Sequence, residues 1–182
     1  MPMNEKKEPR RRPLRLAGFD YSQAANYFIT ICTKGNKCIF GYMSGTEMRL
    51  SSAGTAVQEA WFGLPSRFPS IVLRELVVMP NHLHAIVGLT RPIQPLKAGA
   101  ASGAPTGKTC APSYPVLGDV IRAFKSISAI EINRILGRRS EAVWQRNYYE
   151  HIIRNLEEYE RIRKYILENL SHWHDDPENV GL

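Results

Sequence analysis

Residues 77–87 read VVMPNHLHAIV, an apolar run that His82 and His84 interrupt. Side chains alternate between the two faces of a strand, so both imidazoles point to one face and Leu83 points to the other. The apolar flanks predict a central strand, which would hold the pair rigidly. Two imidazoles on one face can bind one divalent metal ion. The alternative is a strand whose histidines lie at the surface or are satisfied by hydrogen bonds.

Patterns on both sides of this stretch predict an α+β domain. Apolar and β-branched residues predict strands at 27–33 and 71–79, a hairpin at 39–50 and an edge strand within 143–153. Apolar residues recur at helical spacing over 53–64, 117–136 and 156–170. Antiparallel strands with helices collected on one face form a ferredoxin-like, RRM-type sheet, and we expect the histidines on its central strand.

The 182 residues, 43% hydrophobic and 23% charged, suit a single domain, which we place at 26–174. Residues 1–25 are expected to form a flexible basic arm, and 175–182 a polar tail. Prolines interleaved with small residues over 91–115 predict a flexible surface insertion. No apolar run approaches the length of a membrane span, so we expect a cytoplasmic protein without a membrane partner.

The formal net charge of +7 favours a polyanionic partner, because lysines and arginines release counterions from phosphate backbones. Nucleic acid is the polyanion that we expect. Several of the basic residues lie in the N-terminal arm, including Arg10, Arg11 and Arg12. Such an arm can bind DNA, and it can also be only a solubilising tail.

The three cysteines, Cys32, Cys38 and Cys110, show no C-x-x-C spacing, so we interpret them as reduced thiols. A zinc site that combines Cys32 and Cys38 with the two histidines is possible, although no spacing signature supports it.

Two histidines leave a divalent metal under-coordinated, and the last predicted helix offers a further ligand. Tyr165 and Asn169 are four residues apart, so they lie about 40° apart on a helix surface. The amide oxygen of Asn169 could complete the metal site, and the same turn would deliver the Tyr165 hydroxyl to whatever the metal binds. Alternatively, Tyr165 is a partly buried helix aromatic and Asn169 a helix-end residue.

This arrangement has a chemical use. A phenol with a pKa of about 10 is a poor nucleophile, but a metal on a phosphate oxygen stabilises the charge of the transition state. Tyrosine can then attack a phosphodiester and form a phosphotyrosine. Three other tyrosines compete for this role: Tyr159 lies within the apolar stripe, whereas Tyr148 and Tyr149 are adjacent, so only one can face the site. The last two can instead stack on bases.

Basic residues outside the arm are candidate DNA contacts. Arg122 and Lys125 fall on the polar face of their predicted helix, where they could follow a phosphate backbone or simply be solvated. Arg146 and Arg154 belong to an aromatic and basic segment that begins at Trp144.

Three motifs carry a family resemblance. The stretch 77–87 resembles the histidine-hydrophobic-histidine signature of HUH endonucleases. The segments WQRNYYEHIIR at 144–154 and YILEN at 165–169 resemble the REP-associated tyrosine transposases, relatives of the transposases that move insertion sequences as single-stranded DNA. The similarity runs from about residue 16 to 179, except for the proline-rich insertion.

The resemblance implies a metal-dependent enzyme that nicks and joins single-stranded DNA. His82, His84 and Asn169 would hold Mg²⁺ or Mn²⁺, and Tyr165, on a C-terminal helix, would be the nucleophile. Members of the family read imperfect palindromes that fold into hairpins, and cleavage leaves a 5′-phosphotyrosine and a free 3′-hydroxyl. The protein is expected to be a monomer or a homodimer, in the bacterial cytoplasm at the nucleoid.

One position departs from the family pattern. Leu170 follows Asn169, where many relatives have proline, so the last helix is predicted to run a turn longer. The asparagine itself favours the REP-associated group, because insertion-sequence relatives often carry glutamine there. Two other functions stay open: a domesticated DNA-hairpin-binding protein that does not cut, and a metal-dependent hydrolase of small phosphoesters.

Overall fold

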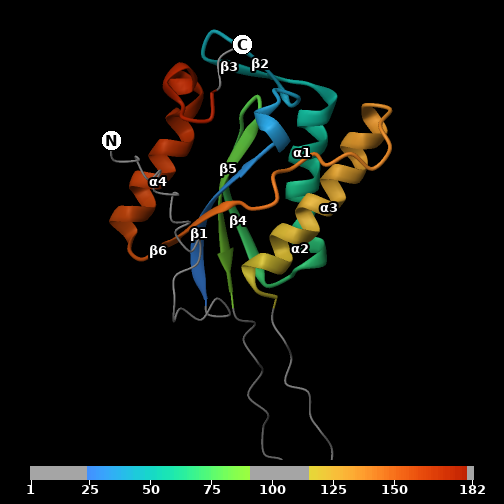
Figure 1. The fold of residues 1–182 in the computed structure, drawn as a ribbon. Coiled ribbons are helices and arrows are strands. Elements are labelled where there is room, and N and C mark those ends of the chain that lie inside the picture. Colours follow the sequence, from blue (N-terminus) through green and yellow to red (C-terminus); the bar gives the residue numbers. More distant parts are fainter. Residues whose placement is uncertain (1–23, 91–114, 180–182) are drawn as a thin grey trace, which may run out of the picture.

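Four antiparallel strands form the main sheet, with the histidine strand in its interior. The computed structural model describes residues 24–90 and 115–179. β1 (Ala25–Cys32), β4 (Ile71–Val78), β5 (His82–Leu89) and β6 (Tyr149–Ile153) follow the order β4-β5-β1-β6 (Figure 1). All neighbouring pairs are antiparallel. The predicted α+β fold is confirmed, and β6 is the edge strand that the sequence predicted.

The apolar pattern of β5 is explained by its position. All eight of its residues are buried, because β4 and β1 flank it and helices cover both faces of the sheet. Leu83, Ala85 and Val87 belong to the larger core, whereas Ile86 belongs to a smaller cluster on the histidine face. Such burial on both sides accounts for a nearly continuous apolar run in place of a polar alternation.

Two helices cover the face opposite to the histidines. α1 (Ser52–Phe62) begins where the Ser51 hydroxyl accepts a hydrogen bond from the Gly54 amide at 3.2 Å, and α3 (Leu117–Ile135) ends before Gly137, whose φ is +62°. The short α2 (Leu64–Arg67) follows α1. The Trp61 and Phe124 rings join α1 to α3 with their centroids 5.2 Å apart. These helices enclose most of the apolar core.

α4 (Leu156–Glu168) lies on the opposite face, to the left of the sheet in Figure 1. The expectation that all helices lie on one face therefore holds for α1 and α3 but not for α4. The physical reason is that the sheet has a second apolar patch, where Ile86 and Ile153 pack against Ile166 of α4. The Asn155 side chain begins α4 by accepting a hydrogen bond from the Glu158 amide at 2.8 Å.

The chain leaves α4 as a tighter helix. η2 (Asn169–Asp175) continues directly from Glu168 with 3₁₀ geometry. The helical path thus continues beyond Glu168, as the absence of a proline predicted, but the α-helix itself ends at Glu168. The change of pitch redirects the chain after Asn169, and the segment 176–179 consequently reaches the histidine strand.

Two smaller elements lie near the same end of the sheet. β2 (Gly41–Ser44) and β3 (Glu47–Leu50) pair as the predicted hairpin and form a separate sheet. η1 (Lys34–Asn36) is a single 3₁₀ turn that follows β1.

Several predictions fall outside the described residues. They concern residues 91–114 of the insertion predicted at 91–115, most of the N-terminal arm with Arg10, Arg11 and Arg12, and Cys110. Within the described ranges, no helix is long and apolar enough to cross a bilayer.

Candidate functional site

The two histidines face each other on the α4 side of the sheet. His82 lies opposite Cys32 and His84 opposite Thr30 in the β1–β5 register, so all four side chains share one face. The two Nε2 atoms are 3.0 Å apart. Both side chains are buried, His82 completely. The alternation along β5 thus pairs the imidazoles as the H-x-H spacing predicted.

The neighbours of His82 determine which of its nitrogens is free. The Asn81 amide nitrogen donates to the carbonyl oxygens of Glu178 at 2.6 Å and Asn36 at 3.3 Å, which orients the Asn81 side chain. Its Oδ1 can then only accept, and it lies 2.8 Å from His82 Nδ1. His82 Nδ1 must therefore carry the proton, which leaves the lone pair of Nε2 directed toward His84.

His84 is held in a similar way from the other side. Its Nδ1 lies 2.8 Å from the Thr30 hydroxyl, and its ring stacks on Phe28 with the centroids 5.5 Å apart. These contacts fix the plane of the imidazole. Nε2 is left to face His82, and the pair is rigid before any ligand arrives.

Asp176 supplies a third donor that sequence reasoning missed. Its Oδ2 lies 3.7 Å from His82 Nε2 and 3.9 Å from His84 Nε2, and its side chain is buried. Within the described residues, these three side chains form the group whose ligand atoms lie close enough together to hold a metal ion. The only sequence signal was an aspartate in a polar segment without periodicity, seven residues after Asn169.

Asn169 lies at the junction of α4 and η2 and is buried. Its side chain hydrogen-bonds to Tyr165. Its Oδ1 is buried and has no hydrogen-bond partner among the described residues. A buried oxygen without a partner is costly, so this atom is a candidate acceptor for a ligand at the site.

Tyr165 reaches the same place from α4. Its hydroxyl lies 3.3 Å from His84 Nε2, and the two rings are 5.3 Å apart. The side chain remains 42% exposed, so a substrate can approach it from solvent. Burial raises the pKa of the Tyr165 phenol, the charge of Asp176 raises it further, and the hydrogen bond from Asn169 opposes the shift. The phenol is therefore protonated at neutral pH.

The three candidate metal ligands, His82, His84 and Asp176, are called the donor group from here on. The electrostatics of this group favour a bound cation. Burial lowers the pKa of His82, and the adjacent His84 lowers it further, although Asp176 opposes the shift. Burial would raise the pKa of Asp176, but the adjacent imidazoles of His84 and His82 and the hydrogen bond from the Glu178 amide outweigh that cost and lower it. The group thus presents a neutral imidazole and a carboxylate at neutral pH, which are the protonation states that a metal requires.

These residues fit a divalent metal. Two imidazole nitrogens and a carboxylate oxygen converge within 4.8 Å of one another, and the remaining imidazole nitrogens make hydrogen bonds that fix the rings. Cys32 and Cys38, the two cysteines within the described residues, do not join this group. Burial raises the pKa of the Cys32 thiol to about 12, with Glu178 adding to the shift, and Cys38 is also absent from the group. The alternative of a cysteine-containing zinc site receives no support.

An aromatic row leads away from the nucleophile candidate. The Phe28 ring contacts the rings of Tyr165 and Tyr149 edge to face, with centroid distances of 6.0 Å and 6.1 Å. Tyr149 is 51% exposed and lies opposite Thr30, on the histidine face. Tyr148 instead packs against the main core, and the Tyr159 hydroxyl donates to Glu75 at 3.0 Å. Of the four tyrosines, Tyr165 is the one beside the donor group.

The candidate DNA contacts on α3 have different surroundings. Lys125 donates to the carbonyls of Gln145 at 3.0 Å and Asn147 at 2.9 Å, and its ammonium lies 5.4 Å from the centre of the Tyr148 ring. Burial lowers the pKa of Lys125 to about 8, and Cys32 opposes the shift. Its ammonium holds the loop before β6 in place. Arg122 is exposed and pairs with Asp119 at 3.1 Å.

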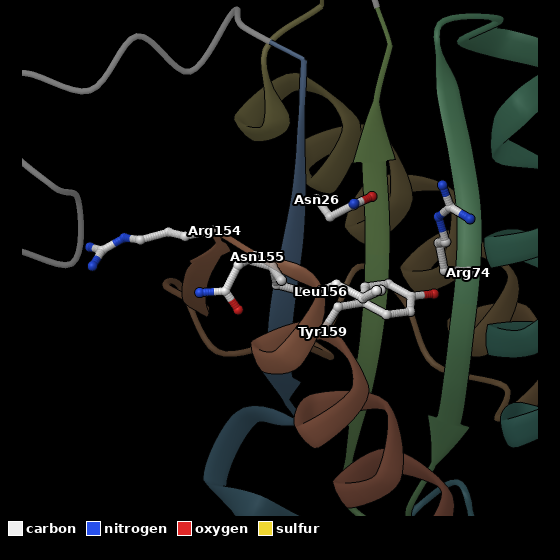
Figure 2. Close-up of a pocket in the computed structure, with 7 residues that line it drawn as sticks. Asn26, Arg74, Arg154, Asn155, Leu156 and Tyr159 are labelled. Atoms are coloured by element: carbon white, nitrogen blue, oxygen red, sulfur yellow. The ribbon is translucent and has the colours of Figure 1, made fainter.

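Arg146 and Arg154 are both exposed and lie on either side of β6. Arg154 borders an open cleft of about 340 Å³ at the start of α4. Figure 2 shows Arg154 and Arg74 on opposite sides of Tyr159, with Arg154 extending away from it. This cleft lies at the end of the sheet that is remote from the histidines. The roles of these arginines in DNA binding stay predictions.

Comparisons with known proteins give a relative and a fold. A protein of Haemophilus influenzae, described as uncharacterized, is 35% identical over 173 residues, which cover 91% of each chain. No protein-family model matches the chain.

Two solved structures resemble the chain at low sequence identity. The structure of the REP-associated tyrosine transposase bound to a REP hairpin is 17% identical with a TM-score of 0.51, over 80% of this chain and 66% of that one. The chain thus spans slightly under two thirds of that transposase. A candidate transposase of Deinococcus radiodurans R1 is 16% identical with a TM-score of 0.48, over 86% and 96%. The resemblance to REP-associated transposases that the motifs indicated is confirmed at the level of the fold. The chain belongs to the same family as the Haemophilus influenzae relative, and it has the fold of the REP-associated tyrosine transposase.

Proposed function

We propose that this protein is a metal-dependent enzyme that nicks and rejoins single-stranded DNA through Tyr165. The observation that carries the proposal is the position of the Tyr165 hydroxyl, 3.3 Å from His84 Nε2 and next to a three-donor group. A nucleophile candidate, a group of metal ligands and an exposed approach from solvent thus meet at one place. Asn169, whose buried Oδ1 has no partner among the described residues, is proposed to contact the metal.

The residues have separate tasks in the proposed reaction. A divalent ion held by His82, His84 and Asp176 would withdraw charge from a phosphate oxygen of the bound DNA. Asn169 orients the Tyr165 hydroxyl toward the phosphorus. The phenol loses its proton to solvent, the Tyr165 oxygen forms a bond to phosphorus, the bond from phosphorus to the 3′ oxygen breaks, and that oxygen takes up a proton from solvent. The energy of the phosphodiester is kept in the phosphotyrosine, so the strand can be rejoined without ATP.

The proposed substrate is single-stranded DNA next to a hairpin. The net charge of +7 favours a polyanion, and the exposed Tyr149 lies two aromatic contacts away from the nucleophile. The transposase with the same fold was solved with a REP hairpin. Binding without cutting is not favoured, because the nucleophile and the donors remain together.

The polarity of the covalent product tests this proposal. A hairpin oligonucleotide with single-stranded flanks is labelled at its 5′ end or at its 3′ end, incubated with Mn²⁺, and run on a denaturing protein gel. The 3′ label should migrate with the protein, and the 5′ label should appear on a free fragment that ends in a 3′-hydroxyl. If neither label becomes attached across a panel of hairpins, although the DNA is bound, the proposal fails.

Tyr149→Ala should weaken single-strand binding. Stacking of a base on an aromatic ring contributes about 1–3 kcal/mol, so we expect a loss of affinity of roughly 5- to 150-fold for flanked hairpins. Fluorescence anisotropy with a labelled oligonucleotide measures the effect. Phe62→Ala removes an aromatic ring of similar exposure from α1, on the other face of the sheet, and should leave the affinity unchanged. Equal losses in both variants would show that Tyr149 has no special role.

The donor set predicts the metal preference. Imidazole nitrogen with carboxylate oxygen suits Mn²⁺ better than Mg²⁺, which prefers oxygen ligands. Cleavage should therefore occur with both ions and be at least as fast with Mn²⁺. Rates at matched ion concentrations after removal of metals by EDTA provide the measurement. A strict requirement for Zn²⁺ would contradict the proposed site.

A further inference from the structure

A second cleft lies at the end of β1 that is opposite His82, between the turn after β1 and the loop after α3. It measures about 560 Å³, within the range of roughly 300–1,000 Å³ that is typical of ligand pockets. Its lining includes three basic side chains, Lys34, Lys37 and Arg138, and one carboxylate, that of Glu141. Its Thr33 and Lys34 directly follow Cys32, which lies opposite His82, whereas its Ile39 and Val143 pack with the main core. The cleft at the start of α4 lies near Asn26, about 20 Å farther along β1.

The cleft is electropositive and its lysines are free. Within the described residues, neither Lys34 nor Lys37 has an ion-pair partner or a side-chain hydrogen bond. Arg138 is only loosely paired, with Glu141 at 3.8 Å. Both lysines are exposed. Uncompensated ammonium groups over a concave surface attract a phosphate, because the charge is not cancelled by a neighbour.

The walls of the cleft are held in place by the backbone. The Thr33 amide donates to the Asn81 carbonyl at 2.8 Å and the Lys34 amide to the Val143 carbonyl at 2.7 Å. Gly35 has a φ of +71°, which allows the tight turn between the two lysines. The lysines thus extend from a fixed turn, and less ordering is required when an anion binds.

A chain of hydrogen bonds joins the cleft to the metal ligands. Asn36, between the two lysines, accepts through its carbonyl a hydrogen bond from the Asn81 side chain, and Asn81 in turn accepts from His82. The position of the turn that carries the lysines is therefore fixed relative to His82. The cleft and the histidines therefore lie at the same end of the sheet.

We propose that this cleft binds a backbone phosphate of the single-stranded DNA that flanks the scissile bond, through Lys34 and Lys37. The inference rests on the proposed function and extends it, because it assigns the path of the strand next to the cut. The ligand class is a phosphodiester of single-stranded DNA, held by two point charges rather than by recognition of a base. Lys34 and Lys37 are positioning residues in this account, since they hold the strand and do not touch the reacting atoms.

Binding measured without catalysis tests the inference. Two labelled hairpins are compared in EDTA, one with oligothymidine flanks on both sides and one without flanks. Each phosphate contact contributes about 0.7 to the salt dependence of single-strand binding, which corresponds to about fivefold in affinity at about 0.1 M salt. Because one phosphate is held, Lys34→Gln/Lys37→Gln should lower the affinity for the flanked hairpin by about fivefold and reduce the salt slope by about 0.7.

Arg67→Gln/Arg161→Gln is the matched control, because it removes the same charge from exposed positions on α2 and α4. It should change the salt slope little, and both variants should melt at the wild-type temperature. Wild-type affinity and slope in Lys34→Gln/Lys37→Gln would overturn the inference, as would an equal loss in the control or an equal loss with the unflanked hairpin. The absence of a covalent adduct, with flank-dependent binding intact, would instead overturn only the nicking activity.

Discussion

Tyr165→Phe should lower formation of the covalent adduct by about a thousandfold or more and leave DNA binding nearly unchanged. Removal of a nucleophile removes the chemical step itself, whereas other contacts to substrate remain. Phenylalanine keeps the ring that packs against Phe28 and His84. The hydroxyl belongs to a side chain that is 42% exposed, so its loss should cost little stability. Adduct formation on denaturing gels and anisotropy with the same hairpin measure the two effects separately.

Tyr159→Phe provides the matched control. Tyr159 lies on the same helix, and its hydroxyl donates to Glu75, away from the donor group. This variant should form the adduct at the wild-type rate. If Tyr159→Phe stopped the reaction and Tyr165→Phe did not, the assignment of the nucleophile would be wrong.

His82→Ala should abolish cleavage and the stabilisation of the fold by Mn²⁺, and retain most of the hairpin affinity. The substitution removes one of three donors and also leaves Asn81 Oδ1 without its partner, which costs about 1–3 kcal/mol of folding stability. Hairpin binding should persist, because backbone charge and base stacking dominate it. Melting temperatures with and without Mn²⁺ report metal binding independently of activity, since a ligand that binds only the folded state raises them.

His151→Ala controls for the loss of a histidine. His151 lies on β6 and pairs with Glu158 at 2.7 Å, outside the donor group. Its removal should leave the Mn²⁺-dependent shift intact. An unchanged shift in His82→Ala, or a lost shift in His151→Ala, would contradict the proposed metal site.

The sequence predicted those elements whose position is set by residues close together in the chain. β5 was visible because it is buried on both faces, and the ends of α1 and α3 carry the serine cap and the glycine that such ends require. The face of the sheet that α4 covers could not be predicted from the residues of α4 alone. It depends on which apolar patch its stripe contacts, and a pattern of spacing does not specify that partner.

The residues of the candidate site likewise include some that a periodic pattern predicted and one that it did not. His82 and His84 follow from the alternation of a strand, and Tyr165 and Asn169 follow from helical spacing. Asp176 could not be predicted in this way, because a 3₁₀ helix carries it back to the strand and no periodic pattern precedes it. Lys125 looked like a free basic residue on a helix face, but its ammonium is bound by loop carbonyls from residues 145–147.

The docking of α4 is the part of the site with the least apolar support. Its buried contacts centre on Ile86, Ile153 and Ile166, whereas the opposite face carries the large core between the sheet, α1 and α3. Burial of one isoleucine side chain contributes about 1.5–3 kcal/mol. The packing of α4, which carries Tyr165, against the sheet is therefore stabilised by only a few such side chains. Ion pairs such as Arg163 with Glu75, at 2.9 Å, add to it at the surface.

The most direct test of the central claim is to map the covalent attachment site by mass spectrometry. Wild-type protein is incubated with a flanked hairpin and Mn²⁺, digested with nuclease and protease, and the peptide that carries nucleotide is sequenced. The account predicts a 5′-phosphorylated nucleotide attached to Tyr165. Attachment to Tyr148, Tyr149 or Tyr159, or cleavage that proceeds to completion without any attached nucleotide, would contradict it.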